Sequence, residues 1–152
     1  MEKLNKFQKI INKIYYNIFV ERNKKKIDFN FEQNFYRWDL IDYLNKKHNF
    51  TSYLEIGCDD DALFSKIKID KKIGIDPVSG GNLKIKSDDF FQTNKENFDC
   101  IFIDGLHEYD QVKRDIKNSI KFLNYNGFIL VHDCLPDQMS KQAVPRYRLL
   151  WN

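Results

Sequence analysis

The segment Tyr53-Leu-Glu-Ile-Gly-Cys-Asp-Asp-Asp61 is the part of the chain from which its fold can be inferred. Its apolar residues are typical of a buried strand, and Gly57 permits a tight turn where a side chain would clash. Dinucleotide and phosphate sites place a glycine-rich turn here, because backbone N–H groups approach anionic oxygens. The turn carries four carboxylates, which would repel a phosphate: Glu55, Asp59, Asp60 and Asp61. Such a turn favours a positively charged ligand, such as a sulfonium or an amino group; the alternative is a surface turn whose Asp caps the next helix.

Downstream of this segment, short apolar runs alternate with helical patterns. We expect strands at 52–56, 72–75, 83–85, 98–103 and 127–131, with helices near 61–68, 88–95 and 108–123. The last two strands are almost wholly apolar, as strands buried on both faces must be. The alternation predicts an α/β fold with a doubly wound, mainly parallel sheet.

The N-terminal third has a different pattern. Apolar residues at helical spacing predict an amphipathic helix over 3–20 and a second helix over about 31–47. The basic face of the first helix could lie on a membrane, but docking on its own domain or on a second subunit is commoner. We therefore divide a single-domain chain into an N-terminal helical segment, 1–50, and an α/β domain, 51–152.

Composition excludes several classes of protein. The net charge of +3 is too small by itself to indicate nucleic acid, and no run approaches the ~18 apolar residues of a membrane-spanning helix. The three cysteines are widely spaced and lack a CxxC pattern. A zinc site or a disulfide framework is not expected, and a cytoplasmic location fits reduced thiols.

Acidic residues stand at the end of every predicted strand. The carboxyl ends of parallel strands form the ligand edge of an open sheet. Asp76 comes about 20 residues after the first turn, where an acid can bind both hydroxyls of a ribose; the alternative is a turn residue before Pro77. Ser87 and Asp88 could bond an adenine edge or serve as the N-cap of the next helix.

Five segments in order resemble a known family: Tyr53-Leu-Glu-Ile-Gly57, Ile73-Gly-Ile-Asp-Pro77, Ser87-Asp-Asp-Phe-Phe91, Phe102-Ile-Asp-Gly-Leu-His-Glu-Tyr109 and Val131-His-Asp-Cys-Leu-Pro136. Over about residues 36–152 the chain is similar to class I S-adenosylmethionine-dependent methyltransferases, with a Rossmann-like fold. The branch it most resembles is that of small bacterial proteins near the macrocin-type and catechol-type O-methyltransferases. The resemblance implies that Glu55 and Gly57 flank the methionine moiety, that Asp76 binds the ribose, and that Ser87 and Asp88 lie beside the adenine. Asp61 stands where relatives often carry a second glycine.

Catechol-type relatives hold a divalent metal between an acid after strand four, an acid after strand five and a following Asn or Asp. Asp104 and Asp133 match the first two ligands, but Cys134 stands at the third position, and Mg²⁺ prefers oxygen. Without a metal, an acceptor hydroxyl needs a base. We favour His107 as that base, with Asp104 as its orienter or as a metal ligand; His132 is the alternative.

These features predict methyl transfer from S-adenosylmethionine to a hydroxyl of a small molecule or sugar. Such folds continue past the fifth strand with a helix and an antiparallel strand pair, whereas this sequence ends about 20 residues after it. We expect either a C-terminally truncated chain or a short sheet edge, and possible homo-oligomers through that edge or the N-terminal helix. The alternative function is a catalytically idle cofactor-binding or assembly module. A nucleotide-dependent oxidoreductase is disfavoured by the absence of G-x-G-x-x-G.

Overall fold

The computed structural model describes residues 6–15, 18–19 and 36–135. The chain divides into two units, one spanning Glu32–Cys134 and one formed by Met1–Phe31 with Leu135–Asn152. The first of these contains a parallel sheet of four strands in the order β2-β1-β3-β4. The strands are β1 (Ser52–Ile56), β2 (Lys71–Ile75), β3 (Phe98–Ile103) and β4 (Leu123–Val131).

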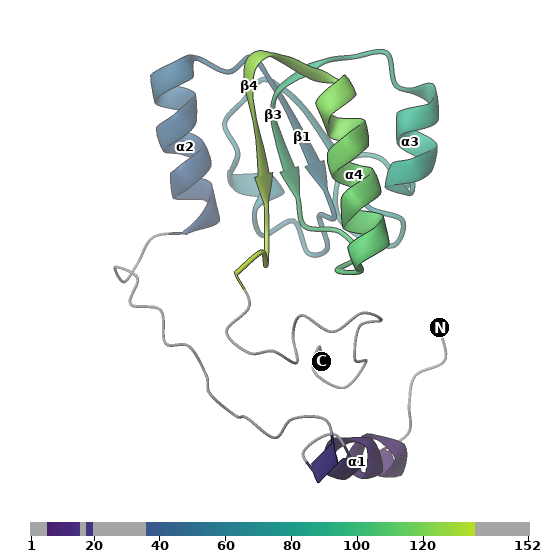
Figure 1. The fold of residues 1–152 in the computed structure, drawn as a ribbon. Helices are drawn as coiled ribbons and strands as arrows, with labels where there is room; N and C mark the ends of the chain where they lie inside the picture. The colour runs from purple at the N-terminus through teal and green to yellow at the C-terminus, as the bar shows by residue number, and fades with distance from the viewer. Residues whose placement is uncertain (1–5, 16–17, 20–35, 136–152) are drawn as a thin grey trace. The chain divides into compact units, whose positions relative to one another are not determined.

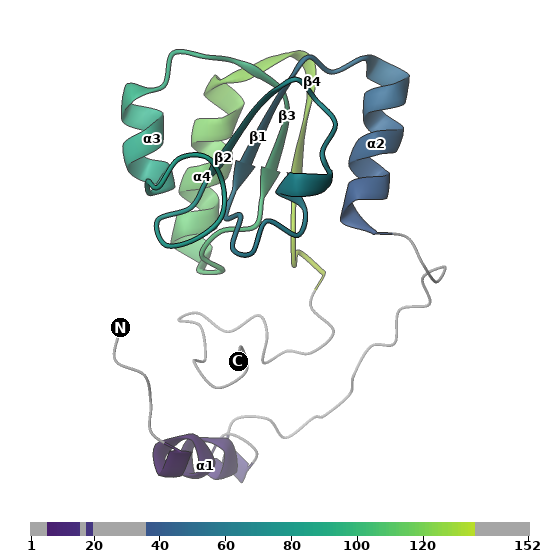
Figure 2. The same cartoon turned by 180° about the vertical axis from the view of Figure 1, so that it is seen from behind.

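Helices cover both faces of this sheet (Figures 1 and 2). Helix α2 (Arg37–His48) covers one face, and α3 (Ser87–Thr93) and α4 (Tyr109–Lys121) cover the other. The chain leaves β1 for β2 on one side and later returns to β3 on the other, so β1 and β3 flank a switch point. The predicted α/β, doubly wound, parallel fold is confirmed.

The alternation of side chains along β1 divides the core in two. All five β1 residues are buried. Tyr53 packs in the cluster on the α2 side with Ile41 and Phe102. Leu54 and Ile56 pack in the cluster beneath α3 and α4. A strand with apolar residues on both sides must lie in the middle of a covered sheet, which accounts for its central position.

Two predicted elements differ from those observed. The expected strand 83–85 is reduced to one parallel bridge between Leu83 and Ile75, because the loop before it turns through Gly80 and Gly81 at positive φ. The expected helix 61–68 is a 3₁₀ turn, η2 (Phe64–Lys66). After the turn at Asp61 few residues remain to return to the start of β2, and extended chain covers about 3.3 Å per residue against about 1.5 Å in a helix.

The N-terminal unit contains α1 (Lys6–Tyr15), which confirms a helix within the expected range. Its apolar side chains at Phe7, Ile10, Ile11 and Ile14 are exposed. Within the part of the chain that the structure describes, no helix has the length and apolarity to cross a membrane. The expected start of the second helix at residue 31 falls outside the described residues, and the boundary at residue 50 and the predicted oligomers stay predictions.

Asp99 on β3 ties the beginnings of three neighbouring strands together. Its Oδ2 accepts hydrogen bonds from the backbone N–H groups of Thr51 (2.7 Å) and Ser52 (3.0 Å), and from both hydroxyls. Its Oδ1 accepts one from Asn124 Nδ2 (2.7 Å). Partial burial raises the pKa of this carboxyl, but the hydrogen bonds outweigh it and bring the pKa to about 2.

Asp99→Asn is expected to lower the free energy of unfolding at neutral pH by about 1–2 kcal/mol, because amide hydrogens would face donors. A carboxyl whose pKa is depressed on folding contributes stability above its unfolded pKa, and loses it as pH falls through the folded value. The wild type should therefore lose this contribution between about pH 4 and about pH 2. Denaturant titrations across this range check it, with exposed Asp89→Asn as the control. Equal unfolding free energies for Asp99→Asn and wild type at neutral pH would contradict the prediction.

Candidate active site

A pocket of about 630 Å³ opens at the carboxyl ends of β1, β2 and β3 and at the beginning of α3. Its size lies within the ~300–1,000 Å³ typical of small-molecule sites. Its lining comprises Ile56, Gly57, Asp59, Ile75, Asp76, Pro77, Val78, Ser79, Ile85, Lys86, Ser87, Asp88, Asp104, Gly105, Leu106, Gln111 and Asp115. We call this the strand-end pocket. It lies at the switch point, where open α/β sheets bind ligands.

Most of the residues singled out in the sequence meet in this pocket. Gly57, Asp76, Ser87, Asp88 and Asp104 all line it, although they come from widely separated parts of the chain. Of its charged side chains, five are aspartates and one is Lys86. Carboxylates around a partly enclosed volume favour a cationic ligand over a phosphate.

Asp76 is fixed at the rim of the pocket by its own loop. Its Oδ1 accepts hydrogen bonds from the backbone N–H groups of Val78 (2.8 Å) and Ser79 (2.9 Å). Its Oδ2 accepts one from Asp59 N (3.2 Å). Burial acts to raise the pKa of Asp76, but these backbone bonds lower it below the ordinary value. Asp76 is thus a turn residue before Pro77, and as an ionised carboxylate it retains acceptor capacity for ligand hydroxyls.

The N-terminus of α3 is joined to α4 by a polar network that the sequence did not indicate. Gln111 Nε2 shares its two N–H donors among three acceptors: Ser87 Oγ (3.2 Å), Asp88 Oδ1 (3.4 Å) and Asp115 Oδ1 (3.1 Å). The N-cap of α3 is Lys86, without a side-chain cap bond, so the helix-cap alternative for Ser87 and Asp88 is not observed.

Asp115 is the acidic residue of the pocket that the sequence analysis missed. It is 1% exposed, and burial raises its pKa against the hydrogen bonds from Ser87 and Gln111. It follows Val112 by three residues and precedes Ser119 by four, so helical spacing places it on the inward face of α4. Asp115 could have been found from the sequence, because a carboxylate on the inward face of a predicted helix indicates a buried polar role.

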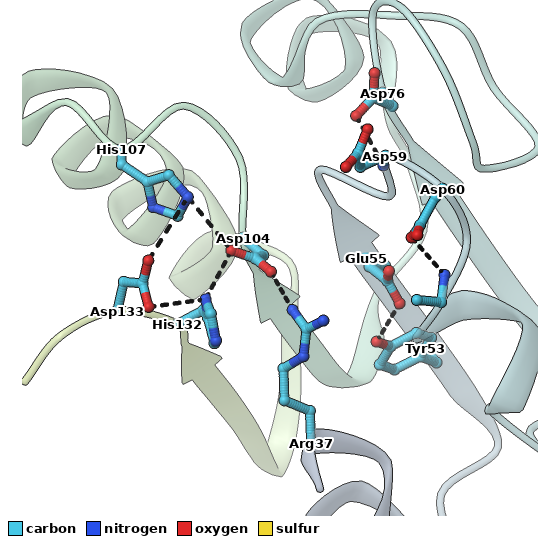
Figure 3. A network of polar contacts seen from close by, with 11 residues as sticks. Arg37, Tyr53, Glu55, Asp59, Asp60, Asp76, Asp104, His107, His132 and Asp133 are labelled. Carbon is cyan, nitrogen blue, oxygen red and sulfur yellow. Dashed lines mark hydrogen bonds and ion pairs between the residues drawn. The ribbon is translucent and has the colours of Figure 1, made fainter. Parts of the chain in front are cut away.

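A second group of ionisable residues lies beside the pocket: Arg37, Asp104, His107, His132 and Asp133, here called the Asp104 cluster (Figure 3). Arg37 Nη1 lies 2.5 Å from Asp104 Oδ2. His132 Nδ1 lies 2.9 Å from Asp104 Oδ1, within ion-pair distance but not aligned for a hydrogen bond. His107 Nε2 lies 3.6 Å from the same oxygen. Asp104 thus faces both the pocket and three nitrogen-bearing side chains.

Asp133 completes the cluster from the turn after β4. The strand ends at Val131, and Asp133 has φ +54°, so its side chain turns back toward the histidines. Its Oδ1 lies 3.3 Å from His132 Nδ1, and its Oδ2 lies 4.0 Å from His107 Nε2. The side chains of His132 and Asp133 would diverge on a continued strand, but this turn brings them together.

Glu55 does not line the pocket. It is 2% exposed and accepts a hydrogen bond from the Tyr53 hydroxyl at 2.7 Å. Burial raises the pKa of Glu55 to about 7, against the lowering effects of that hydrogen bond and of Arg37. Its proposed place beside a methionine moiety stays a prediction.

Glu55→Gln is expected to raise the free energy of unfolding above neutral pH by about 1–3 kcal/mol, because a neutral amide avoids a buried charge. A carboxyl whose pKa is raised on folding gives full stability below its unfolded value of about 4.5, and that stability falls as pH rises to about 7. The difference between variant and wild type should therefore grow from about pH 5 to about pH 8 in denaturant titrations. Glu96→Gln, at a surface pair with Lys71, is the control. A constant difference would contradict the prediction.

Gly57 allows the end of β1 to approach β3 closely. Its φ is +85°, and a Cβ there would lie 2.3 Å from the backbone oxygen of Asp104. Gly57→Ala is expected to lower the free energy of unfolding by about 2–3 kcal/mol, since strain and a backbone clash combine. Thermal unfolding checks this against Gly105→Ala, whose Cβ would meet Ile56 Cγ2 at an ordinary 3.4 Å. Equal melting temperatures for the two variants would refute it.

The predicted metal ligands do not fit a hard divalent cation. Both Asp104 oxygens face nitrogen-bearing side chains, and Cys134 Sγ lies 3.5 Å from the backbone oxygen of His132. Among residues 6–15, 18–19 and 36–135, no group of three or more His, Cys, Asp or Glu side chains is arranged to hold a metal ion. Mg²⁺ requires several oxygen ligands in octahedral geometry.

Part of the chain matches a known protein family. Residues 76–134 match a family model described as a methyltransferase domain. The matched region runs from Asp76 through α3, β3 and α4 to the turn after β4. It therefore includes most residues of the strand-end pocket and of the Asp104 cluster. Searches of curated proteins and of solved structures gave no match. The family match supports a methyltransferase domain.

Proposed function

We propose that this protein is an S-adenosylmethionine-dependent methyltransferase that acts on a hydroxyl of a small molecule or sugar. The observation that carries the proposal is the strand-end pocket, in which five aspartates gather at the switch point within and beside the matched methyltransferase region. S-adenosylmethionine carries its transferable methyl group on a positively charged sulfonium. An acidic pocket favours that ligand, and neutral S-adenosylhomocysteine is released more readily.

Several residues of the pocket have a role under this proposal. Asp76 accepts the ribose hydroxyls, and Ser87 with Asp88 bonds the adenine edge. The Gly57 turn flanks the methionine part, whereas Glu55 would reach it only if its buried side chain moved, because Glu55 is 2% exposed and does not line the pocket. These contacts would leave the sulfonium end of the ligand on the side of the pocket that Asp104 lines, next to the Asp104 cluster. Alignment of the reacting groups supplies much of the rate enhancement in such a reaction.

The Asp104 cluster would receive the acceptor. His107 takes the proton of the acceptor hydroxyl, and Asp104 orients and stabilises the imidazolium that forms. The acceptor oxygen forms a new C–O bond as the S–C bond breaks, so the products are a methyl ether, a neutral thioether and a protonated base. His132 is the alternative base, since it lies nearer to Asp104.

Calorimetric titration of the purified chain with S-adenosylhomocysteine tests the proposal, with NAD as the control ligand. Micromolar binding of S-adenosylhomocysteine alone is expected. Absence of binding by a folded chain would refute the proposed cofactor. Preference for NAD would indicate an oxidoreductase. A positive result justifies a screen of hydroxylated acceptors.

A further inference from the structure

We infer that this site needs no divalent metal, and that the guanidinium of Arg37 supplies the positive charge at Asp104 where a metal-dependent site would place its ion. The inference rests on the proposed function, because it concerns the charge beside the acceptor oxygen. It makes Arg37, which the sequence analysis did not single out, a positioning residue that acts through Asp104.

The fold presents Arg37 to Asp104 from a well-anchored helix end. Arg37 is the first residue of α2, after the N-cap Tyr36. Asp39 Oδ2 accepts a hydrogen bond from Tyr36 N at 2.9 Å, and the Tyr36 ring stacks on Trp38 at a centroid distance of 4.4 Å. Trp38 in turn packs against the core beneath α2. The contacts of Tyr36 and Trp38 therefore hold the backbone of Arg37 in place beside Asp104, although 67 positions separate the two residues in the sequence.

In the contact between Arg37 and Asp104, the carboxylate is more shielded from water than the guanidinium. The Asp104 side chain is 15% exposed and that of Arg37 is 38% exposed. A guanidinium carries five N–H donors in a rigid plane, and its contact with Asp104 uses Nη1. Arg37 can thus neutralise the carboxylate and still offer donors to an acceptor oxygen that gains negative charge as its proton is removed.

A divalent cation on Asp104 would have to displace this arrangement. It would share Asp104 Oδ2 with a guanidinium at 2.5 Å and would be repelled by it. The other oxygen faces His132 Nδ1 at 2.9 Å. Asp133 would be the second ligand, but both of its oxygens lie within 4.0 Å of an imidazole nitrogen.

At the position of the third metal ligand, Cys134 offers a sulfur atom instead of an oxygen. Its exposed thiol is a soft ligand that suits zinc or copper(I) rather than Mg²⁺. The loss of an oxygen ligand at 134 and the presence of a guanidinium on Asp104 are independent features of the chain. Both features disfavour a hard cation. The guanidinium of Arg37 also places a positive charge at Asp104, where a metal ion would otherwise supply it.

Electron paramagnetic resonance with Mn²⁺ as the probe tests the inference without an acceptor. The wild type is expected to leave millimolar Mn²⁺ unbound, while the double variant Arg37→Met/Cys134→Asp should bind it through three carboxylates. Arg37→Lys/Cys134→Asp retains the cation and should bind far less. Lys46→Met/Cys134→Asp is the matched control, since Lys46 lies on the same helix and pairs with Asp42 at 3.5 Å. It should behave like Arg37→Lys/Cys134→Asp.

Mn²⁺ binding by the wild type that is lost in Asp104→Asn would overturn the inference. So would Mn²⁺ binding of equal strength in all three double variants, or its absence from a folded Arg37→Met/Cys134→Asp chain. The wild-type measurement stands even where the double variant fails to fold. Titration of the same samples with S-adenosylhomocysteine separates the two proposals. If the folded wild type does not bind S-adenosylhomocysteine, the proposed function is refuted. The Mn²⁺ results address only the role of Arg37 at Asp104.

Discussion

Asp76→Ala is expected to weaken binding of S-adenosylhomocysteine by roughly 100-fold or more, since two hydrogen bonds to an ionised carboxylate are lost and each tenfold change equals about 1.4 kcal/mol. The carboxylate lies on the wall of the strand-end pocket and is held there by three backbone N–H groups. Like any aspartate of ordinary or lowered pKa, it is ionised at neutral pH and can accept both ribose hydroxyls. Calorimetry on wild type and variant measures the loss.

Two further variants separate binding from folding. Asp76→Asn can still accept the N–H groups of Val78 and Ser79 with its one oxygen, so its loop should be better preserved than that of Asp76→Ala. It should show an intermediate affinity, because the charge is gone. Asp89→Ala removes an exposed aspartate outside the pocket and should bind like the wild type. Unchanged affinity in a folded Asp76→Ala chain would refute the ribose assignment.

The sheet and the strand-end pocket could be predicted because their determinants are local. An apolar run followed by a turn residue indicates a buried strand and its direction, and parallel strands bring their ends to one edge. That logic placed Gly57, Asp76, Ser87, Asp88 and Asp104 together, and all five line the pocket. Their separate roles toward a cofactor stay predictions.

Other features depend on tertiary contacts that leave no local pattern. Arg37 reaches Asp104 across 67 residues, and an arginine at a helix start is otherwise an ordinary solvated side chain. The segment after Asp61 has helical composition, yet the distance back to β2 limits it to a 3₁₀ turn. Leu83 reads as part of a strand, but the paired glycines before it leave only one bridge to Ile75. In each case geometry imposed by the rest of the fold outweighed residue preference.

His107→Ala is expected to lower kcat by about 10²–10⁴-fold, the usual contribution of a general base, and to leave affinity for S-adenosylhomocysteine unchanged. His107 lies outside the strand-end pocket but adjoins it, because Asp104, Gly105 and Leu106 form part of its wall. Its Nε2 lies 3.6 Å from Asp104 Oδ1, a distance that a bound acceptor can shorten. The rate is measured with any hydroxylated acceptor that the wild type methylates.

His132→Ala decides between the two histidines, because both contact the same carboxylate oxygen. If His107 is the base, His132→Ala should reduce kcat by a smaller factor through loss of the contact that steadies Asp104. A larger loss in His132→Ala than in His107→Ala would transfer the role to His132. Equal kcat values for both variants and the wild type, with cofactor binding intact, would show that neither imidazole takes the proton. The acceptor would then have to ionise without a histidine base, and the charge on Arg37 would become the principal means of stabilising its oxygen.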